Sequence, residues 1–407
     1  MSSCVRKRLQ LSVLFLSLLS SLHHHAQVRN AASSRVRSPS LSETYVLYPL
    51  LLKKDATMPP NPKTIALCIF LFLSSALITL TLKSSPHPRP WLPSSNHQPS
   101  YSLPNTPKVA FATFLAANAN PDRAAIDAAS AALDDADDGY YLGTRVLAYQ
   151  LLHSRSASPN TTAQIPFLVL CTRDVSRRKR DRLKRDGATI VLVEKLQADW
   201  VHAAVERWVD VLAKLRLFQL TEYHKICFVD ADTLVTKPID GVFYDEATLT
   251  QPTLPNPEQT KPDEAPLPRT YMFATHGDYW TYEHPYPPVT DLNYLNCGFF
   301  VFTPSTTLFD YYMSLLSIPG RFDPGFPEQN LLNYAHRREG NMPWKPLWYG
   351  WNVNWPTERD WRGGARSFHA KYWDGDPSHD PVLKGIWERQ RSEMEGFYRG
   401  RDEGGWS

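Results

Sequence analysis

The sequence predicts an α/β fold, in which a mixed, mostly parallel sheet carries helices on both faces and a single transmembrane helix precedes it. From Lys108 onward, short apolar runs alternate with segments of helical spacing, which is the order of repeated strand–helix units. One run, Lys225–Val229 (KICFV), is apolar almost throughout, as expected for a strand buried on both faces. The composition, 43% hydrophobic and 12% aromatic, is sufficient for a sizeable core and excludes disorder of the whole chain.

The predicted elements follow one another in the order βαβαβαβ. Four strands are predicted over Lys108–Phe114, Ile165–Cys171, Ala188–Val193 and Lys225–Val229. Three helices are predicted between them, over Tyr140–His153, Val175–Arg185 and Val201–Leu220. Because such sheets bind ligands at the carboxyl ends of their strands, the residues that follow Val229 are the first candidates for a site.

Basic residues gather before one long apolar segment. Residues 1–63 carry nine Lys and Arg against two acidic residues, although the chain of 407 residues has a net charge of only +3. Thr64–Leu82 then runs for nineteen residues without a charge or a proline, which is long enough to cross a hydrocarbon core of about 30 Å. Because positive charge favours the cytoplasmic side, residues 64–83 are predicted to be a signal anchor with a cytoplasmic N-terminus.

The segments around this anchor complete the predicted domain plan. Residues 1–63 are a cytoplasmic tail, or sequence upstream of a true start at Met58; their apolar run Leu11–Leu22 has the length of a signal-peptide core. Residues 84–107 hold seven prolines and six serines and are predicted to form an extended stem. Residues 108–407 are then the lumenal domain of a single-pass type II protein of the Golgi or ER membrane.

The predicted domain is net acidic, with 33 Lys and Arg against 39 Asp and Glu. This balance excludes a general nucleic-acid surface. Its three cysteines, Cys171, Cys227 and Cys297, show neither a disulfide framework nor zinc spacing. The sequence favours no particular oligomeric state.

Two carboxylates, Asp230 and Asp232, follow the apolar strand directly. Unpaired at the tip of a buried strand, they would repel each other and cost stability. A divalent cation would remove this repulsion and would bind a pyrophosphate. The alternative is a turn at the strand end with two helix-capping acids.

A second enzymatic interpretation of this pattern is a phosphatase of the haloacid-dehalogenase type. Those enzymes also place D-x-D after an apolar strand, with the first Asp as the nucleophile, and a small residue and then Thr normally follow. Here Thr233 follows at once, and the pattern lies about 120 residues into the domain. The phosphatase is therefore the less favoured interpretation.

The stretch Ala213–Val235 (AKLRLFQLTEYHKICFVDADTLV) resembles the glycogenin-like glycosyltransferases of family 8, which have the GT-A fold. The resemblance extends over most of the predicted domain. It implies that Asp230 and Asp232 hold Mn²⁺ with the diphosphate and ribose of a UDP-sugar, and that Ala231 between them belongs to the same donor-binding site. It also implies that Lys214 lies near the donor sugar and its phosphates.

Two further matches concern the uracil base. Tyr140-x-x-Gly143 resembles the family's tyrosine that stacks on uracil, and Thr113 and Leu115 of the first strand would line the base. A flat ring with few charges is a suitable partner for an aromatic side chain. The alternative for Tyr140 is an ordinary aromatic residue at the start of a helix.

The segment Leu295–Phe302 (LNCGFFVF) resembles the family's N-S-G-V-F-V strand. The resemblance implies that Asn296 contacts the donor sugar and that Gly298 belongs to the same binding site. The alternative for Asn296 is a turn residue.

The resemblance assigns candidate catalytic residues to the segment Gly320–Asn333. Asp323 matches the family's first acid, and Glu328 and Gln329 stand in the place of its Asp-Gln pair after a two-residue insertion. As an alternative, Glu328 is the acid of a helix N-terminus that follows Pro327.

The third metal ligand of the family is a histidine near the end of the domain. Ser367–Trp373 (SFHAKYW) offers His369, and Lys371 would contact the leaving diphosphate. A histidine with two carboxylates suits Mn²⁺ better than Mg²⁺. The alternative is a packed histidine without a metal.

The sequence thus predicts a metal-dependent, retaining glycosyltransferase that moves a hexosyl or N-acetylhexosaminyl group from a UDP-sugar to a glycan or glycoprotein. Retention can proceed through Asp323 or Glu328 as a nucleophile or by return on the same face without one. The alternatives are the phosphatase and a catalytically inactive sugar-binding protein on the same scaffold.

Aromatic residues follow a Pro-rich insertion at Pro252–Pro268 and predict an acceptor groove, or else part of the core. They are Tyr271, Tyr279, Trp280, Tyr282 and Tyr286, with Trp348, Trp351 and Trp355 further on.

Overall fold

The computed structural model describes residues 108–117, 138–158, 165–205 and 208–404. The predicted cytoplasmic segment, anchor and stem, residues 1–107, lie outside the described residues. Within the described part, every helix is too short or too polar to cross a bilayer. All described residues belong to one compact unit, Ser100–Ser407.

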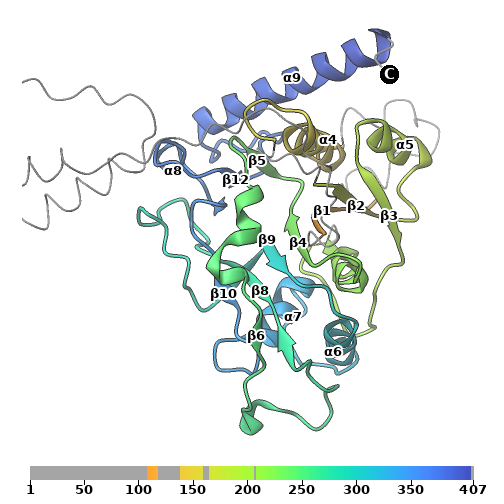
Figure 1. Ribbon diagram of the computed structural model, residues 1–407, viewed down its shortest axis with the longest axis vertical. Coiled ribbons are helices and arrows are strands. Elements are labelled where there is room, and N and C mark those ends of the chain that lie inside the picture. Colours follow the sequence, from red (N-terminus) through yellow and green to blue (C-terminus); the bar gives the residue numbers. More distant parts are fainter. Residues whose placement is uncertain (1–107, 118–137, 159–164, 206–207, 405–407) are drawn as a thin grey trace, which may run out of the picture. The chain divides into compact units, whose positions relative to one another are not determined.

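A seven-stranded sheet in the order β10-β8-β9-β4-β1-β2-β3 forms the centre of this unit (Figure 1). Its strands are β1 Val109–Leu115, β2 Phe167–Thr172, β3 Thr189–Val193, β4 Lys225–Val229, β8 Phe273–Gly277, β9 Leu295–Phe302 and β10 Lys345–Pro346. β9 runs antiparallel to both its neighbours, and the other adjacent pairs are parallel. The predicted mixed, mostly parallel α/β sheet is therefore confirmed.

Helices cover both faces of this sheet. One face packs against α4 (Gly139–Leu152) and α5 (Arg177–Arg185), and the other against the 3-10 helix η4 (Val211–Gln219), α6 (Thr306–Leu316) and α7 (Pro327–Ala335). Successive residues of β1 alternate between the two cores: Phe111 packs on the α4 side, whereas Ala110 and Ala112 pack on the α7 side. Burial on both faces explains why the central strands are largely apolar.

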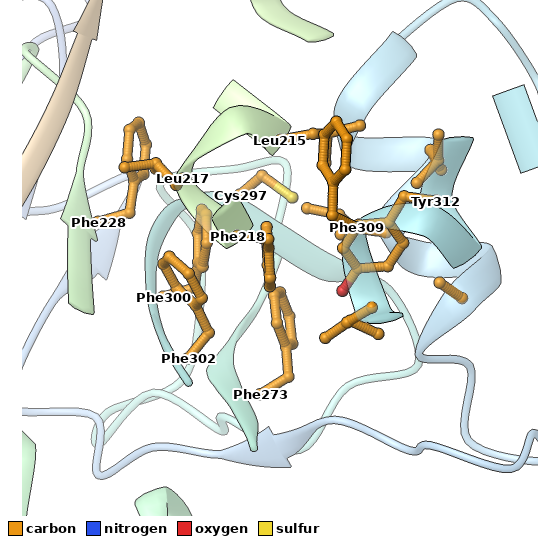
Figure 2. Close-up of a cluster of buried hydrophobic side chains, with 14 of the residues drawn as sticks. Leu215, Leu217, Phe218, Phe228, Phe273, Cys297, Phe300, Phe302, Phe309 and Tyr312 are labelled. Atoms are coloured by element: carbon orange, nitrogen blue, oxygen red, sulfur yellow. The ribbon is translucent and has the colours of Figure 1, made fainter. Parts of the chain in front are cut away.

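The core on the η4, α6 and α7 side is rich in phenylalanine (Figure 2). The Phe218 ring of η4 lies 4.2 Å from that of Phe302 and 4.9 Å from that of Tyr312, measured between ring centroids. Large rings bury much apolar area each, so this cluster ties η4 and α6 to the middle of the sheet.

The predicted helix over Val201–Leu220 is wrong. Of the described residues in this range, Val211–Gln219 form a regular helix, and it is of the 3-10 type. Three residues per turn place every third side chain in one row, and Leu212, Leu215 and Phe218 of that row are all buried in the core. Tertiary packing thus overrides the 3.6-residue pattern that the sequence suggests.

A small second sheet joins segments that are far apart in the sequence. Its strands are β5 Thr233–Val235, β12 Ser367–His369 and β11 Val353–Asn354, and β12 pairs antiparallel with β5. In this register His369 lies opposite Thr233. A residue near the end of the domain is thereby placed beside the end of β4.

The C-terminal helix α9 (Pro381–Gly404) follows the short helix α8 (Glu358–Arg362) and lies across α4 (Figure 1). Gln150 of α4 and Gln390 of α9 hydrogen-bond to each other between the two helices. Gln150 also accepts from the backbone N–H of Val235, and Gln390 donates to the carbonyl of Val235. The two helices therefore hold the edge of β5.

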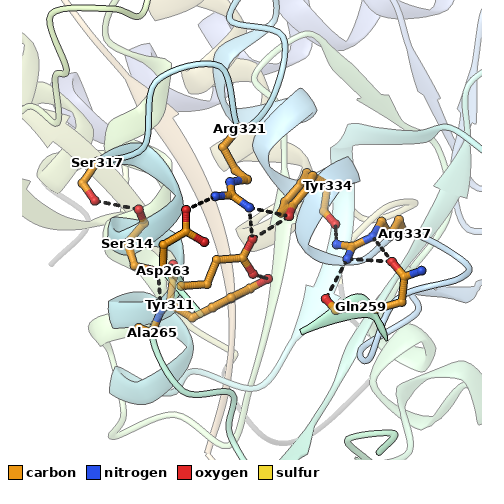
Figure 3. A network of polar contacts seen from close by, with 10 residues as sticks. Gln259, Asp263, Ala265, Tyr311, Ser314, Ser317, Arg321, Tyr334 and Arg337 are labelled. Atoms are coloured by element: carbon orange, nitrogen blue, oxygen red, sulfur yellow. Dashed lines mark hydrogen bonds and ion pairs between the residues drawn. The ribbon is translucent and has the colours of Figure 1, made fainter. Parts of the chain in front are cut away.

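The Pro-rich insertion is fastened to α6 and α7 by polar contacts (Figure 3). It contains the short helix η7 (Pro257–Gln259) and is flanked by the strands β6 (Gln251–Pro252) and β7 (Thr270–Tyr271). Glu264 accepts hydrogen bonds from Arg321 Nη1 at 2.9 Å and from the Tyr311 hydroxyl at 3.0 Å. Further short helices, η5 (Asp240–Tyr244) and η6 (Glu246–Thr248), connect β5 to the insertion.

Candidate active site

Three side chains of different elements meet at the end of β4. One oxygen each of Asp230 and Asp232 and one ring nitrogen of His369 lie within 4.8 Å of one another. His369 Nε2 is 2.9 Å from Asp232 Oδ1 and 3.9 Å from Asp230 Oδ2. Two carboxylates and an imidazole form a donor set that fits a divalent transition ion, so these residues could hold a metal.

Backbone contacts place these three side chains. The N–H of Asp230 donates to the carbonyl of Gly298 on β9 at 2.8 Å, and the N–H of Ala370 donates to the carbonyl of Asp232 at 2.9 Å. A Cβ atom on Gly298 would lie 2.0 Å from His369 Cε1. The absence of a side chain at Gly298 is therefore what allows the imidazole to approach the aspartates.

Charge pairing stabilises the ionised forms of this cluster. Burial opposes the charge of Asp232, but the charges of His369 and Lys371 outweigh it and hold the pKa of Asp232 well below its usual value. Burial likewise opposes a charged His369, yet the neighbouring Asp232 raises the pKa of His369. The ammonium of Lys371 lies 3.1 Å from Asp232 Oδ2.

Lys214 of η4 bridges the metal cluster and α7. Its ammonium lies 3.0 Å from Asp230 Oδ1 and 2.7 Å from Glu328 Oε1. Burial opposes the charge of Lys214, but the two carboxylates outweigh it and raise its pKa. A cation is thus held permanently beside Asp230.

The cluster opens into a cavity of about 590 Å³. Tyr140 at the start of α4 lines it, and its ring meets that of Trp373 edge-on with 5.2 Å between centroids. A Cβ atom on Gly143 would lie 2.5 Å from the Trp373 ring, so the small residue makes room for the indole. Tyr140 thereby stands in a fixed position on the cavity wall.

The sequence was compared with those of known proteins. No family model matches the sequence. An uncharacterized protein of Schizosaccharomyces pombe is 28% identical over 296 residues, which are 65% of this chain and 77% of that protein. Human glycogenin-1 is 28% identical over 201 residues, which are 48% of this chain and 45% of glycogenin-1. The chain resembles the glycogenin-like glycosyltransferases. The resemblance predicted from Ala213–Val235 is thereby confirmed.

Among solved structures, mouse xyloside xylosyltransferase 1 is similar with a TM-score of 0.38 and 12% identity. The superposition covers 64% of this chain and 97% of the mouse chain.

Most of the residues that the glycogenin-like resemblance singled out share this one cavity. They are Tyr140, Lys214, Asp230, Ala231, Asp232, Asn296, Glu328, Gln329, His369 and Lys371. Gly298 lies directly behind His369. The helix predicted after Pro327 is also observed, with Glu328 in the first turn of α7. Glu328 therefore stands both at a helix start and on the cavity wall.

The structure does not place the side chains of Thr113 and Leu115 on the cavity wall. Both are buried, and Leu115 packs in the α4-side core. The wall is lined instead by Phe114 and Ala116. Because side chains alternate along a strand, Thr113 and Leu115 face away from this wall, and their contact with a base stays a prediction.

The position of Asp323 also differs from the prediction, because Asp323 lies outside this cavity. It is exposed, its Oδ1 accepts from the backbone N–H of Gly325 at 2.8 Å, and it lines a separate surface hollow with Asn330 and Arg338. Asp323 therefore does not share the cavity of Asp230, Asp232 and His369.

One buried acid of the cavity was not predicted. Asp278 directly follows β8 and accepts hydrogen bonds from Asn296 Nδ2, Asn354 Nδ2 and the Trp355 indole. The sequence offered one signal for this residue: Asp278 directly follows the short run Met272–Gly277, in the same way that Asp230 directly follows the strand ending at Val229. That run is too short and too polar for the sequence to indicate a strand.

Proposed function

We propose that this chain is a GT-A glycosyltransferase that uses a divalent ion, Mn²⁺ rather than Mg²⁺, and a UDP-sugar. It would transfer a hexosyl or N-acetylhexosaminyl group to a glycan or glycoprotein acceptor. The observation that carries the proposal is the cluster of Asp230, Asp232 and His369, with Lys214 and Lys371 beside it, in one cavity. The confirmed resemblance to glycogenin-like glycosyltransferases supports it.

Different residues of the cavity would bind different parts of a nucleotide sugar. Asp230, Asp232 and His369 would hold the ion, which when bound neutralises charge on the diphosphate. Lys371, 3.1 Å from Asp232, is positioned to contact the departing diphosphate. Tyr140 offers its ring to the uracil base.

Retention without an enzyme nucleophile is the route that we propose. Asp323 lies outside the cavity, and the carboxylate of Glu328 is held by Lys214 at 2.7 Å. A carboxylate in a close ion pair is a poor nucleophile, and a double displacement needs a free one next to the reacting carbon. The acceptor hydroxyl would therefore attack on the face that the diphosphate leaves.

The location of the enzyme is part of the proposal. The apolar run Thr64–Leu82 and the basic residues before it support a type II signal anchor. The catalytic domain would then lie in the lumen of the Golgi or ER, where glycan acceptors are presented.

The test measures hydrolysis of a panel of UDP-sugars by the full chain, purified in a detergent without a sugar headgroup. We expect turnover of at least one donor that requires Mn²⁺ and is lost on chelation. Asp232→Asn should reduce this turnover at least about 100-fold, because the variant removes one charge from the ion-binding cluster. Asp310→Asn is the matched control, since Asp310 is an exposed residue of α6.

Three results would count against the transferase. Equal turnover by Asp232→Asn and the wild type would separate the activity from this site. Hydrolysis of p-nitrophenyl phosphate without turnover of any UDP-sugar would favour the phosphatase. Binding of UDP-sugars without any turnover would favour the inactive sugar-binding protein.

A further inference from the structure

Two tryptophans on the cavity wall have a left-handed backbone conformation. Trp280 has φ 59° and Trp355 has φ 58°, and they are the non-glycine residues of the described chain with positive φ. Such a conformation is strained for a residue with a side chain and persists where surrounding contacts impose it. Both residues line the cavity that holds the candidate metal cluster.

A single carboxylate oxygen contacts both tryptophans. Asp278 Oδ1 accepts from the backbone N–H of Trp280 and from Trp355 Nε1, each at 3.1 Å. It also accepts from Asn354 Nδ2 at 2.9 Å. Asp278 is buried, where hydrogen bonds to a charged acceptor are strong. One fixed atom therefore holds the Trp280 backbone and the Trp355 indole.

The Trp280 ring is exposed to solvent, although two other aromatic rings pack against it. Trp280 has 48% of its surface accessible, while the rings of Tyr294 and Phe326 lie 5.4 Å and 5.6 Å away between centroids. Tyr282 meets Trp355 edge-on at 5.2 Å. A rigid, exposed aromatic face at the wall of a polar cavity is a surface suited to a ligand.

A chain of hydrogen bonds through Asn296 connects this aromatic surface to the candidate metal cluster. Asn296 Nδ2 donates to Asp278 Oδ2 at 2.9 Å, and Asn296 Oδ1 accepts from the N–H of Gly298 at 2.8 Å. The carbonyl of Gly298 in turn accepts from the N–H of Asp230. A molecule on the tryptophans is therefore within reach of a sugar bound at the cluster.

We propose that Trp280 and Trp355 form the acceptor subsite, and that its occupant is a saccharide whose pyranose ring stacks on the indoles. This inference rests on the proposed function. The chemistry of the surface supports a saccharide. The C–H face of a pyranose can stack on an indole, and its hydroxyls can hydrogen-bond with Asn296, Asn354 and Asp278. A lipid chain would place apolar surface against these polar side chains and would offer them no hydrogen bonds.

The subsite specifies the transfer step. The oxygen of an acceptor hydroxyl forms the new bond to the anomeric carbon while the bond from that carbon to the β-phosphate oxygen breaks. The hydroxyl proton passes to the departing diphosphate, so no additional co-reactant is needed. Asp278 acts as a positioning residue that holds the tryptophans.

The test measures saccharide binding by the full chain in a detergent without a sugar headgroup. Calorimetric titrations with maltose, cellobiose, lactose, N-acetyllactosamine and mannobiose are made in the presence of Mn²⁺ and UDP. We expect at least one of them to bind, and Trp280→Ala to weaken it at least about tenfold. Trp280→Phe, which keeps a ring, should lose less. Tyr244→Ala is the matched control, because Tyr244 is an aromatic residue that is 87% exposed and is not among the residues lining this cavity.

Asp278 is tested by a spectroscopic readout as well as by affinity. Asp278→Ala should weaken saccharide binding and change the near-ultraviolet circular dichroism of the tryptophans, whereas Asp278→Asn, which keeps an oxygen acceptor, should restore part of both. An unchanged tryptophan spectrum in a folded Asp278→Ala variant would overturn the positioning role.

The outcomes separate this inference from the proposed function. Wild-type turnover of UDP-sugars with equal saccharide affinity in Trp280→Ala and the wild type would overturn the subsite and leave the transferase standing. Failure of the wild type to bind any of the five sugars would also overturn it. Saccharide binding that depends on Trp280, without any donor turnover, would support the subsite and count against the transferase.

Discussion

Gly298 shows how a single residue controls the candidate metal site. A Cβ atom at this position would lie 2.0 Å from His369 Cε1 and 2.4 Å from His369 Nδ1. These separations are far below van der Waals contact, so the ring would have to move away from Asp232. The glycine is thus required by the close approach of the imidazole.

We therefore expect Gly298→Ala to bind Mn²⁺ at least about tenfold more weakly than the wild type, because displaced ligand side chains lose affinity for the metal. Isothermal titration with Mn²⁺ measures this effect. Gly375→Ala is the control, since a Cβ atom there meets no atom within 4 Å. Unchanged affinity in Gly298→Ala would show that His369 is not a ligand.

His336 is a buried histidine that the fold holds in the neutral form. Its Nδ1 lies 2.8 Å from the Met342 carbonyl and its Nε2 lies 2.6 Å from the Tyr312 hydroxyl, so the first nitrogen donates and the second accepts. Burial lowers the pKa of His336 to about 4. A second proton would remove the acceptor of Tyr312.

Stability should accordingly fall in acid between about pH 6.5 and pH 4. In this range the unfolded chain binds a proton at His336 that the folded chain does not, so the free energy of unfolding rises with pH, by up to about 1.4 kcal/mol per unit. Urea unfolding of the wild type and of His336→Gln at several pH values measures it. The difference between the two should shrink toward pH 4; a difference independent of pH would contradict the assignment.

At the scale of elements, the pairing of β5 with β12 builds the site. β5 begins one residue after Asp232, and β12 ends at His369. Their antiparallel register fixes the backbone of His369 against Thr233, and α4 and α9 hold the edge of β5 through Gln150 and Gln390. The metal cluster therefore depends on helices that contribute no ligand to it.

The helix α9 also supports the predicted base-binding wall. Trp387 of α9 is buried, with its ring 6.2 Å from that of Trp373, which in turn meets Tyr140. We expect Trp387→Ala to lower the free energy of unfolding by about 3–5 kcal/mol, as for other large buried aromatic residues. Chemical denaturation measures this loss. Arg389→Ala, at an exposed position of the same helix, should cost less than about 0.5 kcal/mol; similar losses would show that α9 is not docked.

At the scale of the whole molecule, the described residues form a core that is complete in itself. Helices cover both faces of the seven-stranded sheet, and the insertion is fastened by Glu264 and Arg321. The acidic balance of residues 108–407 provides no general attraction for a nucleotide sugar. The proposed binding of a nucleotide sugar would then come from local charges, namely Lys214, Lys371 and a cation at the candidate metal cluster.

We therefore expect residues 108–407 alone to fold and to bind UDP in the presence of Mn²⁺ with the affinity of the full chain. A single cooperative unfolding transition and a matched titration would support this. Aggregation of the shortened chain, or an affinity more than about tenfold weaker, would contradict the predicted boundary at Lys108.

The sequence by itself determined the α/β class, the four parallel strands and the pair Asp230 and Asp232 at the end of β4. These features depend on local apolar runs, because a strand buried on both faces must be apolar along its length. The resemblance to glycogenin-like enzymes added His369 and Lys214, which only the folded chain brings to within hydrogen-bond distance of the two aspartates.

Tertiary structure alone decided which face each side chain takes. It turned Phe114 rather than Thr113 toward the cavity, left Asp323 at the surface, and tightened η4 into a 3-10 helix. It also brought the Trp280 backbone and the Trp355 indole within hydrogen-bond distance of one oxygen of Asp278. The physical reason is that strand register, loop path and left-handed backbone are imposed by packing between distant segments, which local periodicity does not encode.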